Sequence, residues 1–135
     1  MVGKNVLIAG GAKNLGGLIA RDLAARGVAS IAIHYNGDAT KAAADDTVAA
    51  VESAGVTAHA FQGDLTSAAA VAALFDQAKR AMGSVDIAVN TTGMVIKKPI
   101  AEVTEADYDA IFAINSKAAF FFIQQAGRHL SDGGK

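Results

Sequence analysis

A glycine-rich segment near the start of the chain has the residues of a phosphate-binding turn. Residues 10–17 read GGAKNLGG, between a short apolar run and a stretch with helical spacing. Glycines allow a backbone to approach a pyrophosphate closely, and the N-terminus of the next helix offers it unpaired N–H groups and a partial positive charge. We therefore expect Gly10, Lys13, Asn14, Leu15 and Gly16 to bind a dinucleotide. A turn that only connects two elements is the alternative.

The spacing of this turn differs from the plain G-x-G-x-x-G pattern. Gly10, Asn14 and Gly16 form the longer pattern G-x-x-x-G-x-G, with asparagine in place of the middle glycine. Gly10 would allow the tight turn, and Gly16 the close packing of helix against strand. Asparagine tolerates left-handed backbone geometry better than other non-glycine residues, so we expect the turn to survive this change.

The residues at the end of the second predicted strand bear on the choice of cofactor. That strand ends about 20 residues beyond the turn, where such folds place the group that recognises the ribose. His34, Tyr35 and Asn36 stand there, and no acid precedes Asp38. Without a carboxylate, a 2′-phosphate has room, and Lys13 or a protonated His34 could supply a cation for it. The sequence therefore favours NADP(H) over NAD(H). The alternative is that His34 is an ordinary strand-end histidine and Lys13 a solvated loop lysine.

Four short apolar runs predict the strands that hold these residues. Strands with continuous apolar runs, each separated from the next by a helix, form parallel sheets covered on both faces. Right-handed crossovers then produce an α/β fold with a doubly wound parallel sheet, the Rossmann arrangement. The predicted strands are residues 5–9, 29–35, 57–62 and 85–89.

Helical spacing predicts a helix after each strand, so the order is β-α-β-α-β-α-β-α. Thr66 or Ser67 is expected to cap the third helix, and Thr104 with Asp107 resembles a capping box for the fourth. The predicted helices comprise residues 15–23, 39–54, 71–82 and 104–130. The same rhythm requires a fifth strand after Lys135. Residues 1–135 are therefore expected to form one dinucleotide-binding domain that is incomplete at its C-terminus.

Composition excludes several classes of function. Lys plus Arg is 12 and Asp plus Glu is 13, so the formal net charge is −1. This balance gives no reason to expect a nucleic acid or a membrane surface as partner. The absence of cysteine excludes disulfides and thiolate metal sites and is compatible with a cytoplasmic protein. His59 and His129 lie in different elements without a carboxylate set, so no metal site is expected.

Four motifs together resemble those of the classical short-chain dehydrogenase/reductase family, including its 3-oxoacyl-(acyl carrier protein) reductases. They occur in the family's order and spacing and extend over the whole chain, but over only the N-terminal half of the family's usual length. Members are NAD(P)-dependent Rossmann enzymes that commonly form dimers or tetramers. The matching residues are Ala9–Gly17, Asp64, Leu65, Asn90, Thr91, Thr92, Gly93 and Asn115.

The resemblance implies a role for each motif. Asp64 would meet the adenine amino group, with the Leu65 backbone beside it, although an acid is favoured near a helix N-terminus in any case. The segment 90–93 would stabilise the central sheet and line the cofactor ribose, although two of its four letters differ from the family's Asn-Asn-Ala-Gly. Asn115 would hold a kinked helix and a water of the proton relay, and it is the catalytic residue assigned here. By itself, it could be a helix-kink residue without chemistry.

The family's remaining catalytic groups do not occur in these residues. Its reaction uses a serine and a Tyr-x-x-x-Lys pair. The residue four positions after Tyr35 is Ala39, and the one four positions after Tyr108 is Phe112, so neither tyrosine has the lysine. We expect the 135-residue chain alone to be inactive, and the intact enzyme to move a hydride between NADP(H) and a small-molecule carbonyl or alcohol. A non-catalytic nucleotide-binding module or sensor is the alternative.

The last predicted helix is the expected subunit interface. Residues 120–122 are three consecutive phenylalanines. Consecutive helical side chains point in different directions, so the three cannot all enter one core. In the family this helix packs between subunits. We expect a homo-oligomer, dimer or tetramer, formed through the helix that runs from Asn115 to Leu130.

Overall fold

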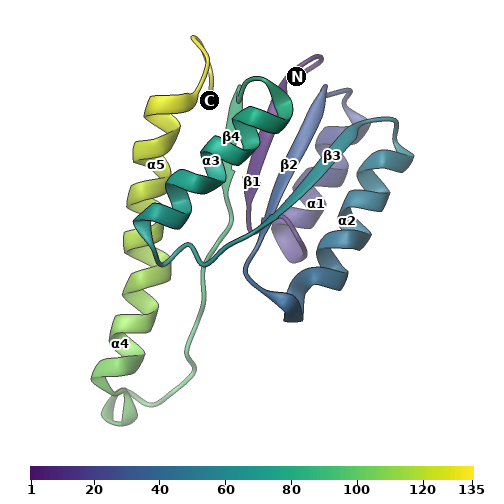
Figure 1. The fold of residues 1–135 in the computed structure, drawn as a ribbon. Helices are drawn as coiled ribbons and strands as arrows, with labels where there is room; N and C mark the ends of the chain where they lie inside the picture. Colours follow the sequence, from purple (N-terminus) through teal and green to yellow (C-terminus); the bar gives the residue numbers. More distant parts are fainter.

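Four parallel strands form one sheet in the computed structural model, which describes residues 1–135. The sheet has the strand order β3-β2-β1-β4 (Figure 1). The doubly wound α/β fold predicted from the sequence is therefore confirmed. The strands are β1 (Asn5–Ala9), β2 (Ser30–Tyr35), β3 (Thr57–Gln62) and β4 (Ile87–Asn90).

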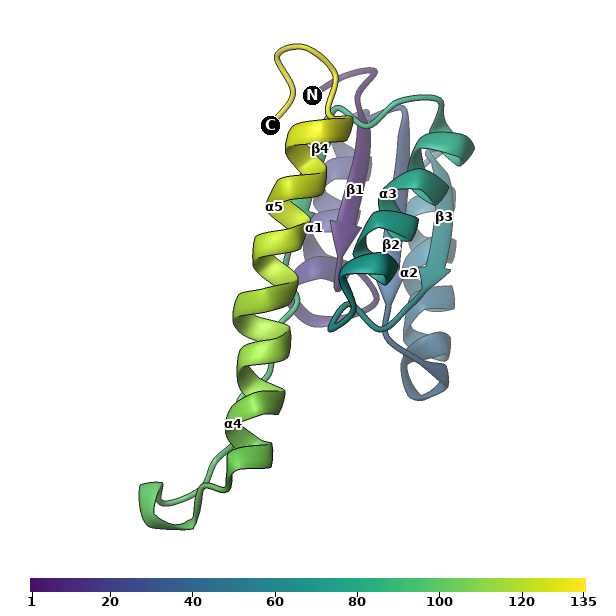
Figure 2. The ribbon, with the colours of Figure 1, turned by 60° about the vertical axis from the view of Figure 1, so that its left-hand side comes forward.

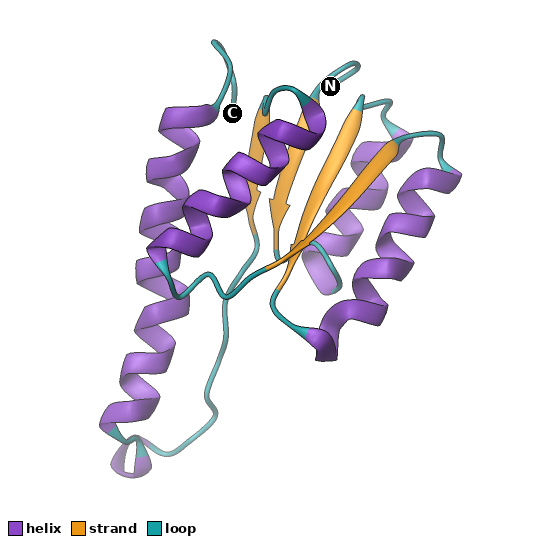
Figure 3. Cartoon of the chain, viewed as in Figure 1, coloured by secondary structure: helices purple, strands orange, loops and turns teal.

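Helices cover both faces of this sheet (Figure 3). Successive side chains of β1 point to opposite faces, so Val6 and Ile8 enter one hydrophobic core while Leu7 and Ala9 enter the other. The first core packs against α1 and α2, and the second against α3 and α5. These helices are α1 (Asn14–Ala25), α2 (Lys41–Ser53), α3 (Ala68–Met82) and α5 (Ala118–His129).

Two helix starts follow the predicted capping residues. The hydroxyl of Ser67 accepts a hydrogen bond from the Ala70 N–H at the start of α3. Helix α4 (Glu105–Phe112) begins with a full capping box, in which Thr104 and Asp107 each accept a backbone N–H from the other. These local signals could be read from the sequence because capping depends on residues only three positions apart.

The fourth predicted helix runs from Thr104 to Leu130 in the sequence pattern, but the structure interrupts it where the family resemblance implied a kink. A π-helical turn, Ala113–Lys117, separates α4 from α5, and the three together form the long column in Figure 2. A π turn contains one residue more than an α turn and often marks a functional position in a helix. Asn115 lies within it.

The second predicted strand and the second predicted helix differ slightly from the observed elements. The strand begins at Ser30, and the helix is preceded by a short 3₁₀ turn, Asp38–Thr40. Another 3₁₀ turn, Ile100–Glu102, interrupts the loop before α4. None of the helices combines the length and the apolar character needed to cross a membrane.

The edge of β4 is contacted by the last residues of the chain. Val85 was predicted inside this strand, but it forms a single parallel bridge with Leu130 and does not join the ladder to β1. The Ser131 N–H donates to the Val85 carbonyl (3.0 Å), and the Ala88 N–H donates to the Lys135 carbonyl (2.8 Å). The segment beyond Leu130 therefore already lies along the edge where a fifth strand was predicted after Lys135.

Candidate functional site

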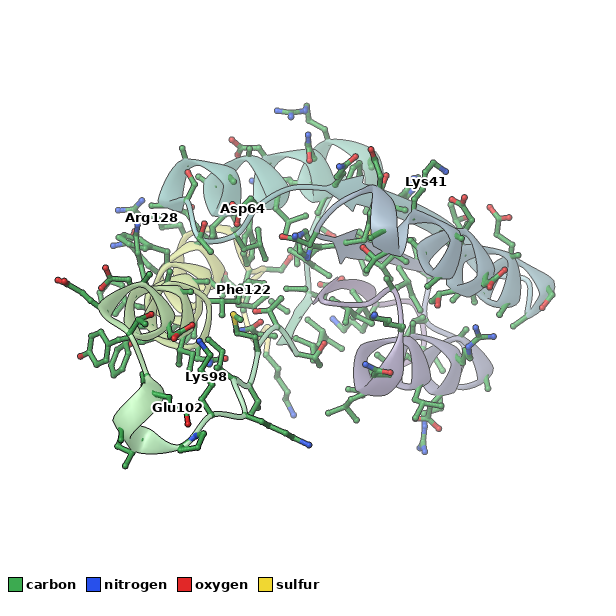
Figure 4. All side chains as sticks on the ribbon, turned by 90° about the horizontal axis from the view of Figure 1, so that it is seen from below. Lys41, Asp64, Lys98, Glu102, Phe122 and Arg128 are labelled. Carbon is green, nitrogen blue, oxygen red and sulfur yellow. The ribbon has the colours of Figure 1, made fainter.

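The carboxyl ends of the strands border a cavity of about 490 Å³. Figure 4 looks onto this edge, with Asp64 labelled below α3 and Lys98 on the loop that leaves β4. The strand order reverses at β1, and doubly wound sheets bind ligands at such a point. The predicted cofactor residues that line the cavity are Gly10, Lys13, Asn14, Leu15, Gly16, His34, Tyr35, Asn36, Asp64, Thr91, Thr92 and Gly93.

The glycine-rich turn has the backbone geometry that its residues predicted. Gly10 has a φ of 76°, and Asn14 has a φ of 50°, the one non-glycine residue with positive φ. A Cβ atom at Gly16 would collide with the Gly10 carbonyl oxygen and lie 2.6 Å from Thr91 Oγ1. Hence Gly16 lets α1 begin against the turn, and Asn14 adopts the left-handed conformation in place of a glycine.

The N-terminus of α1 is open to an anion at this cavity. The Lys13 backbone occupies the N-cap position in an extended conformation, and no side chain caps the helix. The first turn also contains no acidic residue. The first amides of a helix have no intrahelical acceptor, so they remain available to a bound phosphate. The exposed Lys13 side chain forms none of the ion pairs in the structure.

Two threonines hold this turn in place from neighbouring elements. Thr91 Oγ1 lies 2.8 Å from the Ala9 carbonyl oxygen and 3.3 Å from that of Gly10, and it donates its hydrogen bond there. The buried Thr47 of α2 donates its hydroxyl to the Ala12 carbonyl (2.8 Å). These bonds fix the carbonyl groups of the turn, so its backbone is organised before any ligand binds.

The geometry of His34 does not fit the cation that a protonated His34 could have supplied. The side chain is 3% exposed, and the Gly10 N–H donates to its Nδ1 (3.2 Å). An acceptor nitrogen cannot carry a proton, so Nε2 bears the hydrogen and donates to the Gly63 carbonyl (2.7 Å). Burial lowers the pKa of His34, against smaller opposing effects of the Gly63 carbonyl and Asp64. His34 is therefore neutral near pH 7, which leaves Lys13 as the cation of this corner.

The other residues at the end of β2 present polar groups without a carboxylate. Tyr35 is half-buried, Asn36 is exposed, and both line the cavity. The nearest acid along the chain, Asp38, begins the 3₁₀ turn and does not line the cavity. The position that carries an acid in NAD-selective sites is therefore uncharged here.

Asp64 is an exposed, ionised group at the rim of the cavity. Its Oδ1 accepts hydrogen bonds from the Thr66 N–H (3.0 Å) and the Thr66 hydroxyl (2.8 Å). These bonds lower the pKa of Asp64. Both bonds use Oδ1, so Oδ2 can accept a donor from a ligand. The Leu65 side chain is buried in the core and does not line the cavity, so its expected role is limited to its backbone.

The residues after β4 divide between the cavity and their own turn. Asn90 Oδ1 accepts from the Thr92 N–H (3.0 Å) and the Thr92 hydroxyl (2.6 Å). Asn90 does not line the cavity, whereas Thr91, Thr92 and Gly93 do. The Asn90 side chain thus shapes the turn that presents its neighbours.

Asn115 ties the π-helical turn to the loop after β4. Its Oδ1 accepts from the Met94 N–H (3.0 Å), and its Nδ2 donates to the Met94 carbonyl (2.8 Å). A Cβ atom on Gly93 would approach Asn115 Oδ1 to 2.8 Å, so the glycine permits this contact. Asn115 does not line the cavity, although its neighbour Ile114 does. The family resemblance implied a kink at Asn115, and the structure adds the paired backbone contact.

Several cavity residues were missed by sequence reasoning. Thr66 could have been found, because it lies two residues after Asp64, where its hydroxyl can bond back to that carboxylate. The others come from separate segments that only the fold brings together. The missed residues are Ala12, Thr40, Thr66, Met94, Ala110 and Ile114.

Comparison with known proteins identifies relatives over the full length of the chain. The family model described as short chain dehydrogenase matches residues 4–135. A hydroxynaphthalene reductase-like protein, Arp2, of Metarhizium brunneum is 39% identical over 135 residues, which are all of this chain and 49% of the relative. Elsinochrome reductase 1 of Elsinoe fawcettii is 38% identical over 133 residues, or 98% of this chain and 49% of the relative. The chain spans about half the length of these curated relatives.

Solved structures show the same similarity. A Burkholderia cenocepacia protein with bound NADP has a TM-score of 0.96 and 62% sequence identity, over 98% of this chain and 50% of that one. A blue fluorescent protein from a metagenomic library, in complex with NADPH, has a TM-score of 0.90 and 37% identity, over 98% of this chain and 53% of that one.

Proposed function

We propose that this chain, which belongs to the short-chain dehydrogenase family, is the cofactor-binding part of an NADP(H)-dependent oxidoreductase. The observation that carries the proposal is the cavity at the switch point of the sheet, where the open N-terminus of α1 meets the glycine-rich turn. Bound nicotinamide dinucleotide supplies the hydride or accepts it. No observation favours the alternative of a non-catalytic module or sensor.

The residues of the turn fit a pyrophosphate. A side chain at Gly16 would occupy space that the Gly10 backbone already takes, so the turn must stay bare and close to the helix. The uncapped amides of α1 offer donors to the phosphate oxygens. Thr47 and Thr91 hold the carbonyl groups of the turn, so those amides keep their direction when a ligand arrives.

The adenosine end of the cofactor would lie between the turns after β2 and β3. Asp64 offers an ionised oxygen to the adenine amino group, and the backbone of the buried Leu65 lies beside it. Lys13 stands at the edge of the glycine-rich turn, and Tyr35 and Asn36 bring no negative charge. This arrangement supports NADP(H) over NAD(H), as do the relatives solved with NADP and NADPH.

The substrate end would lie toward the loop after β4. Thr92 and Gly93 line that end of the cavity, and Asn115 holds the adjacent Met94 backbone from the π-helical turn. We assign Asn115 to the proton-relay side of the reaction on this placement. The substrate would be a small-molecule carbonyl or alcohol, and the chain of 135 residues by itself would not turn it over.

Exposed apolar side chains on α4 and α5 support assembly with a second copy of the chain. Tyr108 and Phe112 stack on each other with ring centroids 4.2 Å apart, and both are exposed. Phe120 is 63% exposed and Ile123 is 71% exposed, whereas Phe122 is buried. Contiguous apolar patches of this kind are typical of subunit interfaces, and we propose a homodimer or homotetramer through this face.

The cofactor proposal is tested by titrating the purified protein with NADPH and with NADH. Lys13→Ala should weaken NADPH binding about tenfold or more and change NADH binding little, because only NADPH carries the 2′-phosphate. Lys41→Ala is the matched control, since Lys41 already pairs with Asp45 on α2. Equal losses for the two cofactors would refute the role of Lys13, and absence of binding to either would refute the site.

A further inference from the structure

We propose that His34 is a neutral positioning residue that joins the two walls of the cofactor site, and that cofactor binding weakens when His34 takes up a proton. The proposal rests on the dinucleotide site proposed above. In this role His34 is neutral, whereas a histidine that binds phosphate would be protonated. The two roles predict opposite effects of low pH on cofactor affinity.

The imidazole bridges two turns that lie far apart in the sequence. Gly10 follows β1 and belongs to the glycine-rich turn, whereas Gly63 follows β3 and precedes Asp64. One ring nitrogen accepts from the Gly10 N–H at 3.2 Å, and the other donates to the Gly63 carbonyl at 2.7 Å. The pyrophosphate side and the adenine side of the site are therefore connected through a single buried ring.

The Gly10 peptide has little freedom to adapt if His34 changes. Its carbonyl oxygen lies 3.3 Å from Thr91 Oγ1, and its Cα lies so close to the Thr91 backbone that an added Cβ would come within 3.2 Å of it. If Nδ1 were protonated, it would be a hydrogen-bond donor facing another donor, the Gly10 N–H. The ring must then turn away, and the N–H of the half-buried Gly10 loses its acceptor.

Few charged groups around His34 favour its protonated form. Asp64, on the connection from β3 to α3, is the acid that faces the ring and favours its protonated form. None of the buried residues of β1 and α3 on this side of the sheet is charged. On β3, His59 is in register with Ala32 rather than with His34. Burial outweighs Asp64, and the lowered pKa of His34 agrees with the geometry.

The test compares the wild type with His34→Asn over the pH range of histidine titration, about pH 5 to pH 8. The Asn carbonyl occupies the place of Nδ1, so it can accept from Gly10 without taking a proton. The 2′-phosphate titrates in the same range, but its effect is common to both proteins and cancels in the ratio of their NADPH dissociation constants. His59→Asn serves as the control for a histidine outside the bridge.

The wild type should lose about tenfold in NADPH affinity relative to His34→Asn as the pH falls through this range. The proposal would be overturned if the NADPH affinities of the two proteins changed in parallel with pH, or if the wild type gained affinity at low pH. Nitrogen NMR of the histidine rings in the free protein is a second readout, and it should show His34 with an unprotonated Nδ1 and a protonated Nε2 at neutral pH. A protonated Nδ1 there would overturn the proposal as well.

The two readouts separate this inference from the proposed function. A protein that binds neither cofactor at any pH would refute the dinucleotide site, while the ring nitrogens would still report on the bridge. A protein that binds NADPH but shows a charged His34 would keep the site and remove the bridge.

Discussion

Gly16→Ala should disturb the glycine-rich turn more than any other single added methyl group in it. Gly16 lies in the first turn of α1, against the backbone of Gly10 and the side chain of Thr91. An ideal Cβ would lie 2.6 Å from Thr91 Oγ1 and 2.8 Å from the Gly10 carbonyl carbon, and it would collide with the carbonyl oxygen. Two of these neighbours are backbone atoms, so relief requires a shift of the turn itself.

The cost follows from three contributions. Overpacking of a tight site costs about 1–3 kcal/mol. Displacement of Thr91 Oγ1 weakens its bonds to the Ala9 and Gly10 carbonyls, at about 0.5–1.5 kcal/mol each. Alanine regains about 1 kcal/mol over glycine as a helical residue. The net loss in the free energy of unfolding should be about 3 kcal/mol.

Urea unfolding followed by circular dichroism measures this loss, and NADPH titration measures the loss of binding that accompanies it. Gly63→Ala is the matched control, since it adds the same methyl group beside the same cavity, where no atom lies within 4 Å of the new Cβ. The control should change the free energy of unfolding by no more than about 0.5 kcal/mol. If Gly16→Ala is as stable as Gly63→Ala, the close approach of α1 to the turn is not a constraint and the reasoning fails.

Three further predictions concern the surroundings of the site. Thr47→Val should cost about 1–3 kcal/mol in thermal or urea unfolding, because it leaves the Ala12 carbonyl without its donor, whereas Thr47→Ser should keep most of the stability. The Lys98 ammonium and the capping box lower the pKa of Asp107 from 3.8 to about 2. This stabilisation is complete above pH 3.8 and is lost as the pH falls toward 2, so Asp107→Asn should flatten the acid side of the stability profile, and an unchanged profile would contradict it. Ile123→Asp should reduce the oligomer to smaller species in sedimentation velocity, and an unchanged sedimentation coefficient would exclude this face as the interface.

The fold could be predicted from the sequence because its signals are local. Apolar runs of strand length alternate with helical spacing, and glycines follow the helices at Gly27, Gly55 and Gly83, each with positive φ. Asn14 adopts the left-handed geometry that its residue type and its place in the turn predicted. Thr104 and Asp107 formed the predicted capping box. Each of these signals depends on residues a few positions apart.

Predictions were less accurate where the partner of a residue lies far along the chain. Val85 has the apolar character of a strand residue, yet it bridges to Leu130 at the outer edge of the sheet. The helical pattern after Thr104 gives no sign of an interruption, and only the family resemblance implied a kink at Asn115. The π turn occurs there, where Asn115 bonds to Met94. Neither contact can be recognised from the periodicity of apolar residues in the sequence.

The residue types and spacing alone determined where the glycine-rich turn lies against the start of a helix, since glycine content and a helix N-terminus are properties of consecutive residues. Only the tertiary structure decided what His34 does there. A histidine at a strand end can be a cation or a neutral bridge, and the choice depends on the burial of its ring and on which groups meet its two nitrogens. Those groups, Gly10 and Gly63, are brought to it by β1 and β3, and this arrangement is a consequence of the strand order rather than of any neighbouring residue.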